Sequence, residues 1–298
     1  MYIGRFAPSP TGPLHFGSLL AATASYLAAR SHRGKWLLRI EDLDKPREVS
    51  GAADSIIRTL ELYGFTWDDS IIYQSKRTSA YQQALEQLKE HTYPCTCSRQ
   101  KIRREADIGE LGLIYPGTCR DNKQPPAHRQ HAIRVRVTNR RICFVDTVQG
   151  EYCQNLKQES GDFVIRRADK LFAYQLAVVV DDQWQGVNHI VRGADLLNNT
   201  PRQIHLQQCL GYLTPHYMHI PLASYSDGQK LSKHTHAPAI TTGSAADITD
   251  NICRALRFLG QNPPLPAEFE HISDCWKWAL EHWDNTLIPK KLSATYLQ

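Results

Sequence analysis

The sequence has no long hydrophobic run. Its most apolar stretch, LAVVV at residues 176–180, is far too short to cross a bilayer, which takes about 20 consecutive apolar residues. No charged start is followed by an apolar block, so the pattern of a secretory signal peptide is missing. No internal repeat or low-complexity tract stands out either. We therefore expect a cytoplasmic protein with no membrane partner.

A strong excess of one charge sign is also missing. The 298 residues include 35 Lys and Arg against 30 Asp and Glu, which gives a formal net charge of +5. Hydrophobic residues make up 42% and charged residues 22%, as in an ordinary globular protein, and the length favours about two domains. This mild basic balance permits a nucleic-acid partner without requiring one.

The eight cysteines are not spaced like the disulfide framework of a secreted protein, and an intracellular chain keeps its thiols reduced. Five of them stand singly along the chain. We expect each of these five to be a small buried apolar residue: Cys143, Cys153, Cys209, Cys253 and Cys275.

The other three cysteines are grouped, with Cys95 and Cys97 in CTC and Cys119 in YPGTC. Three thiols at this spacing either bind zinc, which takes four ligands in a closed structural site, or are buried free thiols. On chemistry alone, three histidines could supply a fourth ligand: His91, His128 and His131.

The pattern along the chain divides it into four parts. Residues 1–91 alternate strands with helices, which favours a parallel sheet covered by helices. Residues 92–160 change to short strands and loops and look like an insertion with its own β-structure. The alternation resumes over 161–240, and the tail, 241–298, is helical. The expected strands are 2–6, 35–42, 132–137 and 141–148, and the expected helices are 19–30, 51–65, 78–91 and 200–213.

The stretch RFAPSPTGPLHFGS at 5–18 is too rich in Pro and Gly for continuous helix or strand. It lies between a short strand and a helix, so His15, Gly17 and Ser18 fall near the helix start. Free backbone N–H groups and the positive end of the helix dipole favour an anion such as phosphate there.

A second cluster, KLSKH at 230–234, follows a Gly-containing loop. Lys230 and Lys233 could hold phosphates as mobile point charges, although such a cluster alone is more often a solvated basic loop. Together with the first loop, the two lysines could stabilise charge that develops on transferring phosphoryl oxygens.

These two stretches carry a family resemblance. PSPTGPLHFGS resembles the His-x-Gly-His signature of class I aminoacyl-tRNA synthetases, and KLSKH resembles their Lys-Met-Ser-Lys-Ser loop. LLRIEDLDKPRE, DFVIRRADKLFAYQLAVVVDD and GVNHIVRGADLLNNTPRQ are similar to the glutamyl branch, so the likeness covers about residues 2–240. Ser18 replaces the second histidine, Leu231 and His234 replace Met and the final Ser, and RGADLL stands where an acidic residue and a histidine are usual.

The resemblance implies a Rossmann-type, doubly wound parallel sheet, with an inserted zinc-containing α+β subdomain and a short helical C-terminal region. It implies adenylation of glutamate. Arg5 and Arg192 suit the two substrate carboxylates, because a planar guanidinium binds a carboxylate bidentately, and Glu41 suits the ammonium. Which arginine takes which carboxylate stays open. The remaining residues of the implied glutamate site are Phe6, Ala7, Pro8, Ser9 and Tyr174.

The same resemblance assigns the ATP site to His15, Gly17, Ser18, Lys230 and Lys233, with His15 and Lys233 as the catalytic pair. Lys233 would stabilise the transition state as the α-carboxylate attacks the α-phosphate and pyrophosphate leaves, and the nucleotide would carry Mg²⁺. In similar relatives a tyrosine four residues before the last cysteine is the fourth zinc ligand, and Tyr115 matches it.

Full-length members of the glutamyl branch continue past the lysine loop into a helical anticodon-binding domain, which we do not find here. The resemblance is therefore to shortened paralogues that attach glutamate to the queuosine base in the anticodon loop of tRNA(Asp), after tRNA-independent activation. We expect a monomer. Two alternatives are a shortened synthetase that charges a tRNA 3′ end, and a catalytically silent paralogue that binds tRNA or glutamate.

Overall fold

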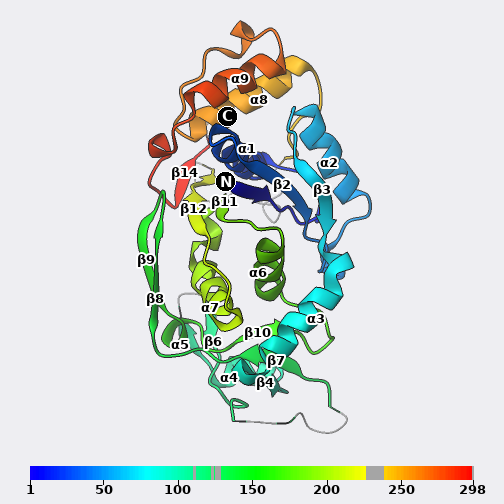
Figure 1. Cartoon of the computed structure of the whole chain (residues 1–298), viewed down its shortest axis with the longest axis vertical. Helices are drawn as coiled ribbons and strands as arrows, with labels where there is room; N and C mark the ends of the chain where they lie inside the picture. The colour runs from blue at the N-terminus through cyan, green and yellow to red at the C-terminus, as the bar shows by residue number, and fades with distance from the viewer. Residues whose placement is uncertain (110–111, 122–123, 125–128, 226–237, 297–298) are drawn as a thin grey trace.

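The molecule is elongated, with the helices of residues 245–282 at one end and the strands and short helix of residues 92–135 at the other (Figure 1). The structure, a computed structural model, describes residues 1–109, 112–121, 124, 129–225 and 238–296. Among them the α-helices are α1 Phe16–Ser31, α2 Ala52–Leu62, α3 Thr78–Gln87, α4 Arg99–Glu105, α5 Leu156–Glu159, α6 Tyr174–Trp184, α7 Thr200–Leu210, α8 Ala245–Phe258 and α9 Ile272–His282. In the described ranges, no helix has the length and apolarity that a bilayer crossing requires.

The strands of the same residues are β1 Ile3–Phe6, β2 Lys35–Ile40, β3 Asp68–Tyr73, β4 Thr92–Cys95, β5 Asp107–Gly109, β6 Gly112–Ile114, β7 Ala132–Val135, β8 Arg141–Asp146, β9 Gly150–Asn155, β10 Phe163–Arg166, β11 His189–Gly193, β12 His216–Ile220, β13 Leu222–Ser224 and β14 Ser293–Thr295. The predicted strands and helices are present, most of them a few residues shorter than expected.

Two parallel sheets position the site. In one, β1 and β3 flank β2, and in the other β11, β12 and β8 run parallel with β9 at the edge. Asn188 joins them, because its backbone N–H donates to the Ile3 carbonyl at 3.1 Å and its side chain accepts from the Ile3 N–H at 2.8 Å. This arrangement confirms the predicted α/β fold with a parallel sheet.

Helix α1 is made mostly of small and apolar residues, and most of them are buried. Leu19, Leu20 and Leu27 are at most 1% exposed, and Trp36 of β2 donates its indole N–H to Ser25 at 2.9 Å. Helices α8 and α9 cover α1, and Ser244 and Asp247 form a capping box that starts α8. One hydrophobic core therefore lies between the β1–β2–β3 sheet and the predicted helical tail, and a second lies around α3, α6 and α7.

The predicted insertion contains antiparallel strands and short helices. Strand β7 pairs with β4 on one side and β10 on the other, and β5 and β6 form a hairpin. Strands β8 and β9 form a second hairpin that joins β12, so this segment shares a sheet with β11 and β12. The division into four parts stays a prediction.

The expectation for the single cysteines is wrong for three of the five, Cys143, Cys153 and Cys209. Cys143 and Cys153 lie directly opposite each other in the β8–β9 hairpin and form a disulfide. Cys143 is exposed rather than buried, and Cys209 is half-buried. Directly opposed residues of an antiparallel pair have neighbouring Cβ atoms, a proximity that a separation of ten residues does not reveal. Cys253 and Cys275 are buried as expected, with Sγ atoms 3.9 Å apart.

Candidate active site

A cavity of about 730 Å³ opens at the carboxyl ends of β1, β2 and β11. Ligand sites of doubly wound sheets lie at this edge, where the strand order reverses. Every described residue of the predicted glutamate and ATP sites lines this cavity: Arg5, Phe6, Ala7, Pro8, Ser9, His15, Gly17, Ser18, Glu41, Tyr174 and Arg192. Lys230 and Lys233 lie outside the described residues.

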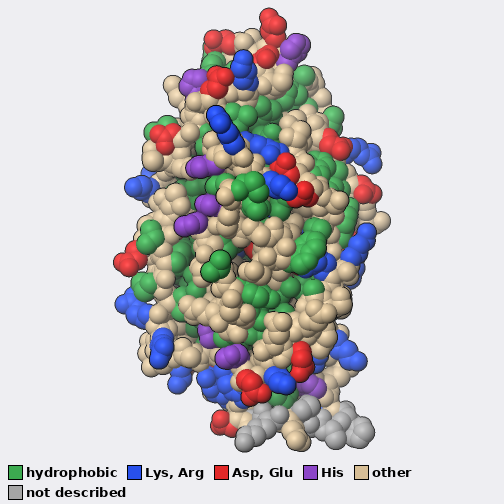
Figure 2. Space-filling model, viewed as in Figure 1, with side chains coloured by type: hydrophobic (Ala, Val, Ile, Leu, Met, Phe, Trp, Pro, Cys, Tyr) green, Lys and Arg blue, Asp and Glu red, His purple; other side chains and the backbone are tan. Residues whose placement is uncertain are grey.

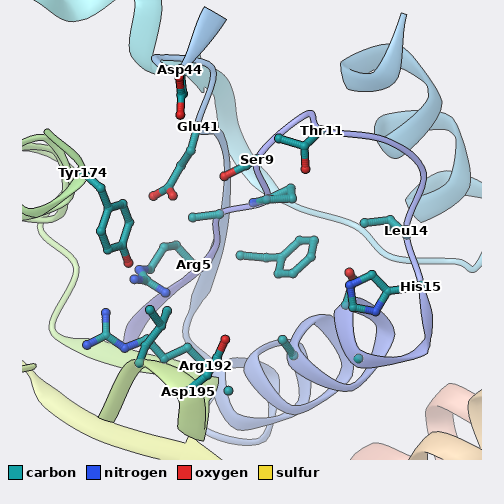
Figure 3. Close-up of a pocket in the computed structure, with 18 of the residues that line it drawn as sticks. Arg5, Ser9, Thr11, Leu14, His15, Glu41, Asp44, Tyr174, Arg192 and Asp195 are labelled. Atoms are coloured by element: carbon teal, nitrogen blue, oxygen red, sulfur yellow. The ribbon is translucent and has the colours of Figure 1, made fainter. Parts of the chain in front are cut away.

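The loop between β1 and α1 forms one wall of the cavity. The Pro8 carbonyl accepts from the Glu41 backbone N–H at 3.0 Å, and the Pro10 carbonyl accepts from Val49 N–H at 2.9 Å. These contacts tie the loop to the segment after β2. Helix α1 begins at Phe16, with His15 in extended conformation at its N-cap, so the first turn of the helix faces the cavity (Figure 3).

Arg5, on β1, is a buried cation with a buried carboxylate partner. Its Nε atom donates to Asp182 Oδ1 at 3.1 Å, and the same oxygen accepts from Arg39 Nη2 at 2.6 Å. Burial disfavours ionisation of Asp182, but Arg39 and Arg5 outweigh it and hold the pKa of this carboxyl below its usual range. The carboxylate of Asp182 thus binds the guanidinium groups of both Arg5 and Arg39 beside the cavity.

Glu41, directly after β2, points toward Arg5 and Tyr174 (Figure 3). Its Oε1 atom is buried, lies 3.7 Å from Arg39 Nη2, and has no hydrogen-bond partner among the described residues. Burial raises the pKa of Glu41 to about 7, against the opposing effect of Arg39 and Arg5. A buried acceptor without a donor is costly, so the site suits a ligand that supplies an N–H.

Arg192, at the end of β11, is 5% exposed. In the described part of the chain its guanidinium donates to three neutral side chains: His219 Nε2 at 3.0 Å, Gln203 Oε1 at 2.9 Å and Thr200 Oγ1 at 2.7 Å. Tyr174 starts α6 on the other side of the cavity, and burial raises the pKa of its phenol against the opposing effect of Arg192. Arg5, Glu41, Tyr174 and Arg192 therefore converge in one part of the cavity (Figure 3).

Sequence reasoning missed the residues that hold these arginines. Asp182 ends the apolar run LAVVVDD, and a carboxylate doublet after a buried run was the available signal. Arg39, His219 and Gln203 gave no signal, since each is a single polar residue inside a strand or helix.

The grouped cysteines come together at the start of the insertion. The Sγ atoms of Cys95, Cys97 and Cys119 lie within 4.8 Å of one another, and the Tyr115 hydroxyl lies 3.3 Å from Cys95 Sγ and 3.6 Å from Cys97 Sγ. The Cys119 backbone N–H donates to the Tyr115 oxygen at 2.9 Å. Of the three histidines, His128 lies outside the described residues; within them, neither of the other two belongs to this group.

A buried cation accompanies the cysteine group. Arg134 Nε lies 3.3 Å from Cys95 Sγ, and its guanidinium carbon lies 3.8 Å above the Tyr115 ring. On the face in Figure 2, Lys and Arg side chains lie along the rim and in the upper middle, with Asp and Glu side chains among them.

Comparison with known proteins connects this cavity to a family. Residues 3–272 match the family described as tRNA synthetases class I (E and Q), catalytic domain. A protein of Dechloromonas aromatica named Glutamyl-Q tRNA(Asp) synthetase is 54% identical over 295 residues, which is 97% of this chain and 96% of that protein. The chain belongs to the glutamyl-Q tRNA(Asp) synthetase family. A Pseudomonas fluorescens protein of the same name is 51% identical over 299 residues, 100% of this chain and 97% of that protein.

The glutamyl-Q tRNA(Asp) synthetase family shares its fold with solved synthetases. A glutamate-tRNA synthetase from Elizabethkingia anophelis superimposes with a TM-score of 0.81 at 24% identity, covering 99% of this chain and 68% of that chain. At this identity the likeness shows the fold alone. Family membership confirms the resemblance read from the loop after β1 and the segments that follow it.

Proposed function

We propose that this chain activates L-glutamate with ATP and transfers the glutamyl group to the queuosine base in the anticodon loop of tRNA(Asp). The observation that carries the proposal is the convergence of two buried arginines and the buried carboxylate side chain of Glu41 in a single cavity. Glutamate has two carboxylates and one ammonium, and this set of charges complements it. The names of relatives above 50% identity support the acceptor.

In this proposal each part of the cavity has one role. Arg5 and Arg192 bind the carboxylates, Glu41 the ammonium, and Tyr174 packs against the substrate, with Phe6, Ala7, Pro8 and Ser9 as the adjoining wall. His15, Gly17 and Ser18 bind the ATP phosphates at the start of α1, as helix N-termini do. Lys230 and Lys233 act on the phosphates by family resemblance, and Mg²⁺ accompanies the nucleotide.

The reaction needs no covalent enzyme intermediate. An oxygen of the α-carboxylate attacks the α-phosphate, pyrophosphate leaves, and glutamyl-adenylate forms. A hydroxyl of the queuosine cyclopentene ring then attacks the glutamyl carbonyl, AMP leaves, and an ester remains on the base. The chain contributes positioning and charge stabilisation, since its buried guanidinium groups are held before substrate arrives. We place this reaction in the cytoplasm and expect a monomer to perform it.

We also propose a structural zinc site formed by Cys95, Cys97, Tyr115 and Cys119. A tetrahedral zinc with Zn–S bonds of about 2.3 Å separates its sulfurs by about 3.8 Å, and the spacing of these atoms fits that geometry. Four anionic ligands would leave the zinc site with negative charge, which Arg134 offsets. The zinc would hold the insertion together and take no part in catalysis.

The test is transfer of labelled glutamate, with ATP, to bulk tRNA from cells that make queuosine and from cells that cannot. We expect label only on the queuosine-containing tRNA, and ATP–pyrophosphate exchange that requires glutamate but no tRNA. Equal label on both preparations would indicate a synthetase that charges the 3′ end. Glutamate binding without exchange or label would indicate a silent binding protein.

A further inference from the structure

The guanidinium of Arg192 is held by a chain of buried groups that leads away from the cavity. Its Nε atom donates to Nε2 of His219, the residue directly opposite it on the neighbouring strand β12. His219 Nδ1 in turn lies 2.6 Å from Asp146 Oδ2, at the end of β8. His219 and Asp146 are 0% and 2% exposed, and neither lines the cavity.

These contacts fix the protonation of the imidazole. Nε2 accepts from Arg192, so it carries no proton, and the ring proton must be on Nδ1, where it donates to Asp146. Burial lowers the pKa of His219 to about 4, against the hydrogen bond to Asp146, which raises it. The imidazole is therefore neutral, and it orients Arg192 without neutralising the arginine's charge.

Backbone N–H groups fix the orientation of the Asp146 carboxylate. Its Oδ1 atom accepts from the backbone N–H groups of Val148 at 3.0 Å and Gln149 at 2.9 Å, and both oxygens accept from the His219 backbone N–H at 3.1 Å. These bonds leave Oδ2 facing His219 Nδ1. The imidazole of His219 thus connects Asp146, at the end of β8 in the predicted insertion, to Arg192.

We propose that Asp146 and His219 are positioning residues for substrate: they hold Arg192 in the orientation in which its guanidinium binds a carboxylate of glutamate. This inference rests on the proposed function, which places a carboxylate at Arg192. A carboxylate partner in place of His219 would also orient the guanidinium, but it would compete with the substrate carboxylate for the positive charge of Arg192. Arg5, whose Nε bonds to Asp182, shows that alternative arrangement in the same cavity.

The geometry predicts the effect of one isosteric change. In Asp146→Asn the amide oxygen must occupy the Oδ1 position, because two backbone N–H groups point at it. The amide NH₂ then faces His219 Nδ1 and donates to it, which moves the ring proton to Nε2. That proton would point at the Arg192 Nε–H, so two donors would face each other and the guanidinium would turn away.

The experiment compares three variants with the wild-type chain in glutamate binding by calorimetry and in glutamate-dependent ATP–pyrophosphate exchange. We expect Asp146→Asn and His219→Leu to weaken glutamate binding and to raise its KM about tenfold or more, with kcat and the KM for ATP within about threefold. His219→Gln keeps an acceptor for Arg192 and should recover most of the binding.

The matched control is His205→Leu, which removes a histidine that is 6% exposed, bonds to the Arg136 carbonyl at 2.8 Å and does not line the cavity. This variant should be less stable than the wild-type chain, with no selective loss of glutamate binding. If the variants raise the KM for glutamate and the KM for ATP equally, or behave like this control, the inference is wrong. The proposed function would still stand, provided that the wild-type chain catalyses the exchange. A wild-type chain that neither binds nor activates glutamate would overturn both. If His219→Leu does not fold, Asp146→Asn and His219→Gln decide the matter alone.

Discussion

The Nε atom of Arg5 lies 3.1 Å from Oδ1 of Asp182, and this buried ion pair joins strand β1 to helix α6 beside the cavity. The same carboxylate binds Arg39 at 2.6 Å. Asp182 therefore supplies a negative charge shared by two buried cations, Arg5 and Arg39, which would otherwise repel each other. Removing one member of such a group leaves uncompensated charge in a site with little water.

We expect Asp182→Asn to lower the free energy of unfolding by about 3–5 kcal/mol, because two buried guanidinium groups lose their anion. Denaturant unfolding followed by circular dichroism measures this change. The matched control is Asp169→Asn: its partner Arg167 is 40% exposed and Asp169 is 48% exposed, so the cost should stay below about 1 kcal/mol. Equal costs for the two variants would show that the Asp182 ion pairs contribute no more than a surface pair.

The pKa of Glu41 predicts a pH dependence of substrate binding. In the free chain this carboxyl is protonated below a pH of about 7, and an ammonium ligand binds its ionised form. The Kd for glutamate should therefore fall as the pH rises from 5.5 through 7, by up to about tenfold per pH unit, and level off above. Glu41→Gln should bind weakly at every pH and lose this dependence, whereas Asp44→Asn, at the same cavity, should keep it.

The same shift predicts how stability changes with pH. The pKa of Glu41 is raised in the folded chain, so its contribution to stability is fully present below the unfolded pKa of about 4.5 and is lost as the pH rises through about 7. Glu41→Gln removes the cost of ionising this buried carboxyl. The Tm of the variant, relative to that of the wild-type chain, should therefore be higher at pH 8 than at pH 5. Thermal unfolding of both proteins at the two pH values measures this. A constant difference in Tm would contradict the raised pKa.

The proposed zinc site predicts one zinc per chain in purified protein. Cys119→Ser should lose most of the metal and destabilise the insertion, because structural zinc contributes directly to folding free energy. Tyr115→Phe keeps the ring over which Arg134 lies but removes the ligand oxygen, so zinc should bind more weakly. The control is Cys209→Ser, a half-buried thiol outside the group. Zinc content by mass spectrometry decides; unchanged binding in Tyr115→Phe would mean that another group is the fourth ligand.

Motifs made of adjacent residues allowed the sequence to predict one side of the cavity. The loop after β1 was recognisable because its prolines, glycines and following apolar helix are contiguous. Glu41 lies at the end of the expected strand 35–42, whereas Arg192 was found only through the family resemblance of its segment. The partners of these residues were not predictable, because they come from strands and helices that meet only in the folded chain. Asp146 and Arg192 are 46 positions apart in the printed sequence, yet one imidazole connects them.

Pairings between distant strands were missed for the same reason. Strand β14 pairs with β13 and ties the end of the described chain to the segment after β12, although neither has more than three residues. Cys143 and Cys153 were expected to be separate because the hairpin register that opposes them cannot be read from their spacing alone. Short polar strands lack the alternation on which a strand prediction depends.

Lys233 lies outside the described residues, and the family resemblance assigns it to the phosphates of ATP. If its ammonium stabilises charge on the α-phosphate as pyrophosphate leaves, Lys233→Ala should lower kcat of the exchange reaction about 10²–10³-fold, the usual cost of losing one transition-state donor. The KM for glutamate should stay nearly constant, since Arg5, Glu41 and Arg192 remain. Lys170→Ala, which removes an exposed lysine, is the control. A selective rise in the glutamate KM would instead assign Lys233 to amino-acid binding, because a group that acts only in the transition state lowers kcat and kcat/KM together.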